Sequence, residues 1–288
     1  MEYTIIKNYR KNDALRASFN SLTYETFGFD FEEWYRNGYW NDKYIPYSIF
    51  FDGQIIANVS VNIMDFENRG SEEHYIQLGT VMTKTEYRNQ GLIRALMTEI
   101  EKDYADVDGV FLFANDEVAG FYPKFGFKTA QEFQCVKTVD ITNEITAEKA
   151  DMNSKEDWDR VRNAIDMSAA NSNFDLRNNS DLAMFYLSSF MRESVYFVKE
   201  TEAYVVADVE GEKLLIHAIY SEKKVDIDTV ISAFGKEVKR AKLGFTPLDS
   251  DGFDKVLLKE EDTTLFVKGK AFDSFTDEKK MFPLLAHA

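Results

Sequence analysis

The pattern of hydrophobic and polar residues along the first 140 positions predicts alternating strands and helices. Runs rich in β-branched and aromatic residues predict strands over 2–8, 47–51, 55–63, 73–83, 109–114 and 128–139. Apolar residues at helical spacing predict helices over 13–27, 31–37, 92–104 and 118–125. The order β-α-α-β-β-β-α-β-α-β implies an α/β chain with a mixed sheet and helices on both faces.

The pattern resumes after a polar segment, 143–154, which is typical of a linker. Ser154 and Asp157 predict a capping box that starts a helix. Further along, strands are expected over 194–198, 202–209, 213–220 and 239–245, with a helix over 226–234. We therefore expect two domains, 1–142 and 155–288. The second is either a degenerate copy of the first or an unrelated, smaller α+β domain.

Length and composition are those of a globular protein. The chain has 288 residues, of which 44% are hydrophobic and 15% aromatic, enough to fill sizeable cores. No apolar run approaches the roughly 20 residues that cross a bilayer, and the N-terminus has no signal-peptide profile. The lone cysteine, Cys135, excludes an intramolecular disulfide. A cytoplasmic location is the expectation.

The net charge of the chain limits the classes of molecule that it is expected to bind. With 34 basic and 50 acidic residues, the net charge of −16 repels nucleic acid and anionic membranes, so neither is expected as a partner. The acidity either favours a cationic acceptor or only keeps the protein soluble. Three scattered histidines, His74, His217 and His287, lack the spacing of a metal site, and no metal is expected.

One polar loop carries candidate chemistry. Arg88-Asn-Gln-Gly91 joins the strand 73–83 to the helix that begins at Leu92. The first turn of a helix leaves N–H groups without partners and favours negative charge, so a pyrophosphate can be held there. Gly91 lets the backbone approach a ligand closely. The loop has neither the Gly-Lys-Ser/Thr ending of a Walker loop nor the three glycines of a dinucleotide fingerprint.

This loop resembles the coenzyme A pyrophosphate loop of the GNAT superfamily of N-acetyltransferases, Arg/Gln-x-x-Gly-x-Gly/Ala. Arg88 and Gly91 match the pattern, whereas Ile93 stands where the family has Gly or Ala. A second segment is similar to the other half of the family's signature. Asn115 follows a strand, Tyr122 comes seven residues later, and 124–127 supply a Lys-x-Gly-Phe ending.

The resemblance implies a GNAT acyltransferase fold in the first lobe, with the second domain then either a degenerate GNAT-like lobe or unrelated. It further implies that an acetyl group moves from acetyl-coenzyme A to a primary amine by direct attack in a ternary complex. Residues expected to bind the coenzyme are Val81, Met82, Thr83, Arg88, Asn89, Gln90, Gly91, Leu92, Ile93 and Asn115.

Tyr122 is the expected catalytic residue, because its hydroxyl is protonated at neutral pH and can protonate the departing thiolate. The same hydroxyl would otherwise only position the sulfur. Asn115 either binds the pantetheine arm or caps the helix over 118–125. No motif fixes the general base. Candidates on the strand before the loop are Glu73, His74 and Gln77.

The acceptor side is expected along the two early helices, which are dense in aromatic residues. These are Tyr24, Phe27, Phe29, Phe31, Trp34, Tyr35, Tyr39, Trp40, Tyr44 and Tyr47, with Glu25, Asp30, Glu32 and Glu33 nearby. They form either a wall that receives a cation or ordinary core packing. Two alternatives to acetyl transfer stay open: a non-catalytic coenzyme A sensor or interaction module, and transfer of another acyl chain. The sequence gives no oligomeric state.

Overall fold

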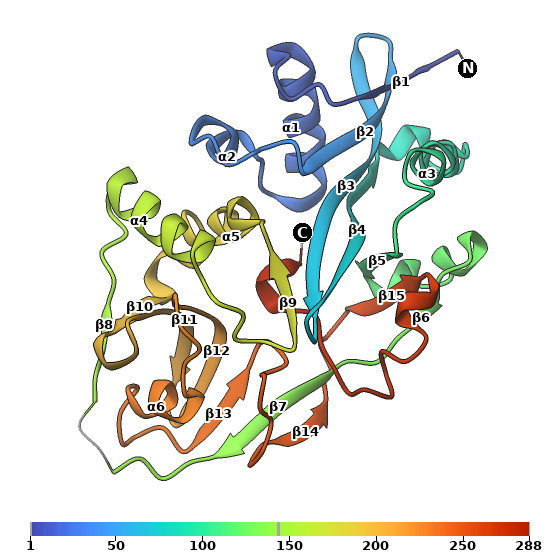
Figure 1. The fold of residues 1–288 in the computed structure, drawn as a ribbon. Coiled ribbons are helices and arrows are strands. Elements are labelled where there is room, and N and C mark those ends of the chain that lie inside the picture. The colour runs from blue at the N-terminus through green and yellow to red at the C-terminus, as the bar shows by residue number, and fades with distance from the viewer. Residues whose placement is uncertain (1, 143–144, 288) are drawn as a thin grey trace.

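The computed structural model describes residues 2–142 and 145–287, which form two mixed sheets with helices on their faces (Figure 1). Sheet A contains β1 (Thr4–Lys7), β2 (Tyr44–Phe51), β3 (Gln54–Asn68), β4 (Ser71–Thr83), β5 (Gly109–Ala114), β6 (Lys128–Thr129), β9 (Phe174–Arg177) and β15 (Thr264–Lys268). Its helices are α1 (Asp13–Phe27), α2 (Glu32–Arg36) and α3 (Leu92–Asp103). The mixed α/β architecture expected from the sequence is confirmed.

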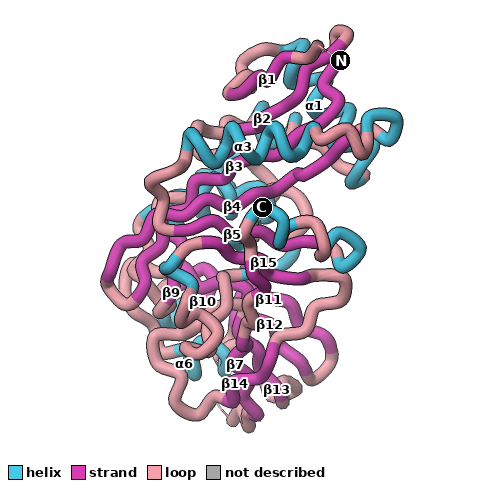
Figure 2. Tube along the Cα trace, turned by 90° about the vertical axis from the view of Figure 1, so that its right-hand side faces the viewer, coloured by secondary structure: helices cyan, strands magenta, loops and turns pink. Residues whose placement is uncertain are grey.

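Sheet B lies beyond sheet A along the long axis of the molecule (Figure 2). It contains β7 (Phe133–Thr138), β8 (Ala147–Lys149), β10 (Val195–Val198), β11 (Ala203–Glu210), β12 (Lys213–Tyr220), β13 (Arg240–Leu243) and β14 (Asp254–Leu257). The helices of this half are α4 (Lys155–Asp166), α5 (Ser180–Leu187) and α6 (Ile227–Ser232). Ser154 and Asp157 form the predicted capping box at the start of α4.

The two sheets share one topology. Sheet A runs β1-β2-β3-β4-β5-β15-β6, and sheet B runs β8-β10-β11-β12-β13-β7-β14. In each sheet only the fourth and fifth strands are parallel, joined by a helical crossover, and all other neighbours along the path are antiparallel. The second lobe therefore repeats the strand order and directions of the first, as expected of a degenerate copy.

Each sheet takes its sixth strand from the other half of the chain. β7 follows β6 in the sequence but pairs with β13 and β14, whereas β15 returns from the C-terminal half to pair with β5 and β6. The single strand predicted over 128–139 is therefore split between the sheets. Hydrophobic periodicity encodes a strand but not the sheet it joins. The domain division 1–142 and 155–288 stays a prediction, and the sheets exchange strands across it.

The hydrophobic core continues from one lobe into the other. One face of sheet A is covered by α3 and the other by α1 and α2. The cluster around Phe19 of α1 and Trp34 of α2 also contains Trp158 of α4, Met184 of α5 and Val206 of β11. Within the described ranges, no helix is both long and apolar enough to cross a membrane.

Candidate active site

A cleft opens in sheet A where β4 and β5 separate. Their parallel pairing ends at Gln77 and Phe111, although β4 continues to Thr83 and β5 to Ala114. The cavity between them has a volume of about 560 Å³. It is lined by 78–81 of β4, by 113–115 at the end of β5, and by side chains from α2, β2 and α5. We call this cavity the acyl cleft.

A bulge in β4 shapes one edge of the acyl cleft. The register with β3 shifts at this point, and Thr80 has a φ of 49°. The amide of Asn58 donates a hydrogen bond to the Thr80 carbonyl at 2.9 Å, and the hydroxyls of Tyr44 and Thr80 lie 2.8 Å apart. Ser48 donates to the Asn58 side-chain oxygen at 2.7 Å, so the polar groups that hold the bulge are themselves satisfied.

The residues just after the bulge, Val81, Met82 and Thr83, are among those expected to bind the coenzyme. Val81 lines the acyl cleft, whereas the side chain of Met82 is buried in the core. The Thr83 carbonyl accepts a hydrogen bond from Arg88 Nε at 3.3 Å. That bond links the end of β4 to the predicted pyrophosphate-binding loop, residues 88–91, which we call the anion loop.

The anion loop has the backbone form of a helix-start binding site. Gly91 is the N-cap of α3, with a left-handed φ of 79°, and Asn89 has a φ of 62°. Residues 88–91 are exposed, and the N–H groups that follow lie in the first turn of a twelve-residue helix. A Cβ on Gly91 would meet no atom within 4 Å, so the requirement for glycine here comes from the left-handed backbone.

Two hydrophobic residues anchor the start of α3. Leu92 is buried, and Ile93 packs against the same core cluster. Ile93 is the position where the sequence departs from the family pattern, and its packing indicates that this side chain belongs to the core.

Tyr122 lies in the wall of the acyl cleft. Its side chain is 4% exposed and packs against Phe127 and, with ring centroids 5.4 Å apart, against Phe266 of β15. Burial raises the pKa of Tyr122 to about 12. The phenol therefore stays protonated across the neutral range and can donate a proton into the cleft.

Asn115 is held by a residue that sequence reasoning missed. Its side chain donates to Asp262 Oδ2 at 2.7 Å, and the Asp116 N–H donates to Asp262 Oδ1 at 2.8 Å. The alternative in which Asn115 caps a helix over 118–125 is wrong. That segment contains two short 3-10 helices, Asp116–Val118 and Tyr122–Phe125, and Asn115 makes no side-chain capping bond. Gly120 and Pro123 both disfavour a continuous α-helix.

The aromatic residues of the expected wall divide between the acyl cleft and other parts of the fold. Of the ten aromatic residues expected there, five line the acyl cleft: Phe27, Phe29, Phe31, Trp34 and Tyr44. The others pack elsewhere or, like Tyr24, are exposed. The carboxylates among the residues that line the cleft are Glu117 and Asp262, whereas the predicted Glu25, Asp30, Glu32 and Glu33 are not part of its lining.

The second lobe supplies the rest of this wall. Leu182, Phe185 and Tyr186 of α5 line the acyl cleft together with Phe190. These residues lie more than 50 positions beyond the motifs of the first lobe, and nothing in their local pattern indicates a site. The hydrophobic core that the two lobes share brings α5 to the cleft, and Phe185 and Tyr186 pack against that core.

The three candidates for the general base do not line the acyl cleft. Glu73 accepts hydrogen bonds from Tyr75 and Asn68 near the opposite end of β4. His74 pairs with Asp65, whose carboxylate raises the pKa of that imidazole. Gln77 is buried where β4 and β5 still pair. The described residues also contain no group of three or more His, Cys, Asp or Glu arranged to hold a metal.

Comparison with known proteins agrees with this geometry. Residues 12–127 match the sequence model of the acetyltransferase (GNAT) family. Comparison with curated proteins gives no match. The fold is similar to that of an Enterococcus faecalis V583 protein described as a probable N-acyltransferase, with a TM-score of 0.61, 12% identity, and coverage of 96% of this chain and 74% of that one.

Two further solved structures show the same fold. Eis1 from Mycobacterium abscessus has a TM-score of 0.57 and 12% identity, with coverage of 91% of this chain and 73% of that one. A GCN5-related N-acetyltransferase from Kribbella flavida has a TM-score of 0.56 and 12% identity, with coverage of 92% and 70%. At such identities the likeness is one of fold. The match to the sequence model identifies residues 12–127 of this chain as a domain of the acetyltransferase (GNAT) family.

Proposed function

We propose that this protein is an N-acetyltransferase that moves an acetyl group from acetyl-coenzyme A to a primary amine. The observation that carries the proposal is the acyl cleft, which brings the bulge of β4, the hydroxyl-bearing Tyr122 and an aromatic wall into one cavity. The exposed start of α3 lies one short loop beyond the end of β4, where a pyrophosphate would be held. We also propose the cytoplasm as its compartment, in keeping with the single, unpaired Cys135.

The reaction follows as direct attack in a ternary complex. The neutral amine attacks the thioester carbonyl, and negative charge develops on the carbonyl oxygen beside the N–H groups of Val81 and Met82. The carbon–sulfur bond then breaks, and the Tyr122 hydroxyl gives its proton to the departing thiolate. The products are the amide and coenzyme A. The proton lost by the amine leaves to solvent, and Tyr122 is reprotonated.

Gly91→Glu should weaken binding of acetyl-coenzyme A by at least 100-fold, measured by calorimetry. A carboxylate at this N-cap would repel the pyrophosphate, and an L residue at a φ of 79° adds strain of about 1–2 kcal/mol. The matched control is Gly211→Glu, which puts the same charge and a similar strain at the β11–β12 turn, where Gly211 has a φ of 57°. Equal affinity of the two variants for acetyl-coenzyme A would show that the pyrophosphate does not bind at this loop.

Turnover separates the enzyme from a coenzyme A sensor. Thiol release from acetyl-coenzyme A should appear when a panel of primary amines is added to the intact chain. Tight binding without turnover across polyamines, amino acids, aminoglycosides and arylalkylamines would instead make the protein a sensor. Comparing acetyl-, propionyl- and succinyl-coenzyme A in the same assay identifies the acyl chain.

The lining of the acyl cleft also suggests the kind of acceptor. The wall is aromatic, and its side chains include two carboxylates, Glu117 and Asp262. Phe190 and Val118 line the cleft and are 64% and 47% exposed, so apolar surface continues from the cavity to solvent. We propose that the acceptor is a primary amine on a bulky apolar body, such as an arylalkylamine. The aromatic side chains of the cleft would pack against the apolar body of the acceptor, and the two carboxylates would attract its ammonium group.

Phe190→Ala should raise the KM for such an amine about tenfold and leave kcat within twofold. Burying a phenylalanine against a ligand contributes about 1.5–3 kcal/mol, and this contact is the same before and during reaction. Met167→Ala is the control, because Met167 is equally exposed and is not part of the cleft lining. A preference for spermidine over phenethylamine would contradict the apolar acceptor and leave acetyl transfer intact.

A further inference from the structure

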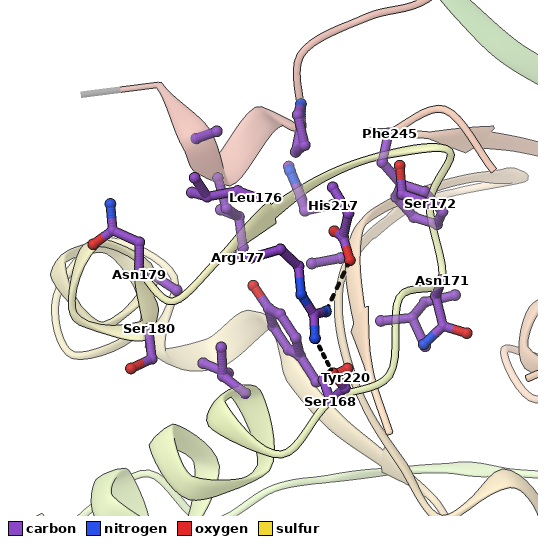
Figure 3. Close-up of a pocket in the computed structure, with 18 of the residues that line it drawn as sticks. Ser168, Asn171, Ser172, Leu176, Arg177, Asn179, Ser180, His217, Tyr220 and Phe245 are labelled. Atoms are coloured by element: carbon purple, nitrogen blue, oxygen red, sulfur yellow. Dashed lines mark hydrogen bonds and ion pairs between the residues drawn. The ribbon is translucent and has the colours of Figure 1, made fainter. Parts of the chain in front are cut away.

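A second cavity occupies the position in the second lobe that the acyl cleft occupies in the first. β12 and β13 of sheet B correspond to β4 and β5 of sheet A, and their parallel pairing ends at Ile216 and Leu243. Like β4, β12 carries a register shift beyond this point, with His217 as the extra residue. Residues 217–220 and Phe245 line the cavity, which we call the second-lobe cavity (Figure 3).

The second-lobe cavity is small because the C-terminal segment enters it. The Leu284 N–H donates to the Gly244 carbonyl at 2.8 Å, and Pro283, Leu285 and Ala286 form part of the lining. The remaining volume is about 90 Å³, against about 560 Å³ for the acyl cleft. The connection 221–226 has neither the glycine nor the arginine of an anion loop, so coenzyme A is not a fitting ligand.

The ionisable side chains of the lining include one guanidinium, Arg177, and two carboxylates, Asp166 and Asp175. Arg177 donates through Nη1 to Asp175 Oδ2 at 3.2 Å and through Nη2 to the Ser168 carbonyl at 2.9 Å. Figure 3 shows the Arg177 guanidinium among the lining side chains, between Tyr220 and His217. The paired side chains stay partly accessible, 32% for Arg177 and 23% for Asp175.

Several polar atoms in this lining lack a protein partner. Across the described part of the chain, no hydrogen bond is made by Asp175 Oδ1, Arg177 Nε or the hydroxyls of Ser180 and Tyr220. Burial raises the pKa of Asp175 to about 6 even though Arg177 lies beside it. The ion pair with Arg177 therefore does not offset the cost of burying the Asp175 carboxylate. A cation bound beside Asp175 would offset more of that cost.

We propose that the second-lobe cavity binds a small zwitterion, an α-amino acid with a short side chain. Its ammonium would pair with Asp175 Oδ1, and its carboxylate would accept from Arg177 Nε and the Tyr220 hydroxyl. The volume suits this class, because about 90 Å³ accommodates roughly six to nine water-sized groups, close to the non-hydrogen atoms of glycine to proline. A simple anion would face Asp175, and a simple cation would face Arg177.

Calorimetry on the intact chain tests the proposal with glycine, alanine, serine and proline as probes. We expect saturable binding of at least one of them at concentrations up to about 10 mM. Acetate and methylamine, which carry one charge each, should bind at least tenfold more weakly. Absence of binding by all four amino acids, or binding of acetate or methylamine as tight as that of the amino acids, would overturn the proposal.

Asp175→Asn tests the assignment of the charges, because it keeps the side-chain volume and a hydrogen bond to Arg177. It should weaken amino-acid binding at least tenfold, and Arg177→Met should do the same. The control is Glu193→Gln, which neutralises one partner of the exposed pair between Lys149 and Glu193 away from this cavity. Unchanged binding in Asp175→Asn, in a protein with an unchanged melting temperature, would place the amino acid elsewhere and overturn the proposal.

Discussion

Replacing Tyr122 by phenylalanine should lower kcat for acetyl transfer about 100-fold or more, while the KM for acetyl-coenzyme A stays within about twofold. The substitution removes the hydroxyl and keeps the ring, which packs against Phe127 and Phe266. The leaving thiolate then departs without its proton. Steady-state kinetics with the preferred amine measure both constants.

The leaving group itself gives a sharper test of this role. A thioester of a more acidic thiol needs less help from a general acid, so it should recover much of the activity lost in Tyr122→Phe. Tyr104→Phe is the control, because Tyr104 lies at the end of α3 and packs against Tyr47. If Tyr122→Phe lost activity equally with both thioesters, the hydroxyl would only orient the coenzyme.

The pH profile separates Tyr122 from the rest of the site. With a pKa of about 12, this phenol remains protonated from pH 6 to pH 10. Any decline of kcat on the alkaline side of that range should persist unchanged in the residual activity of Tyr122→Phe.

Separating the chain between residues 142 and 143 should leave neither fragment folded alone and should restore a folded protein when the fragments are combined. Fragment 1–142 lacks β15, whose Leu265, Phe266 and Val267 are 0–4% exposed in the intact chain. Burying three such side chains contributes about 5–9 kcal/mol, comparable with the entire stability of a typical domain. Fragment 143–288 lacks β7, which pairs with both β13 and β14 in the intact chain, so sheet B is incomplete in that fragment.

Thermal melting monitored by circular dichroism checks this expectation. Each fragment alone should show no cooperative transition, whereas the co-expressed pair should melt cooperatively and bind acetyl-coenzyme A. The uncut chain is the reference. A cooperative transition in fragment 1–142 alone, with native affinity for the coenzyme, would show that β15 is dispensable for the first lobe.

The parts of this molecule that sequence predicted are local. The anion loop, the strand before it and Tyr122 are each encoded within a few residues, through glycine punctuation, period-two alternation and a short motif. The predicted strands of the second lobe occur with boundaries close to those expected. The local pattern also predicted an α-helix that does not form. Residues 118–125 have helical spacing, but Gly120 and Pro123 disfavour a continuous helix there.

What the sequence did not disclose depends on pairing between distant segments. The partner of Asn115 is Asp262, which lies 147 positions away, and the wall of the acyl cleft is completed by α5. β7 and β15 have strand-like sequences that fit either sheet equally well. Their placement is decided by which neighbours they meet in three dimensions, and no periodicity records this.

Because β15 lies near the C-terminus, sheet A cannot be completed until late in the synthesis of the chain. β6, at the edge of sheet A, leaves the ribosome roughly 140 residues before β15, an interval of about 7–28 s at 5–20 residues per second. Throughout that interval the edge of β5 has no partner, and such edges are prone to join another chain. Nascent chains of this protein should therefore depend on chaperones until β15 emerges, and swapped dimers are the expected product when it is delayed.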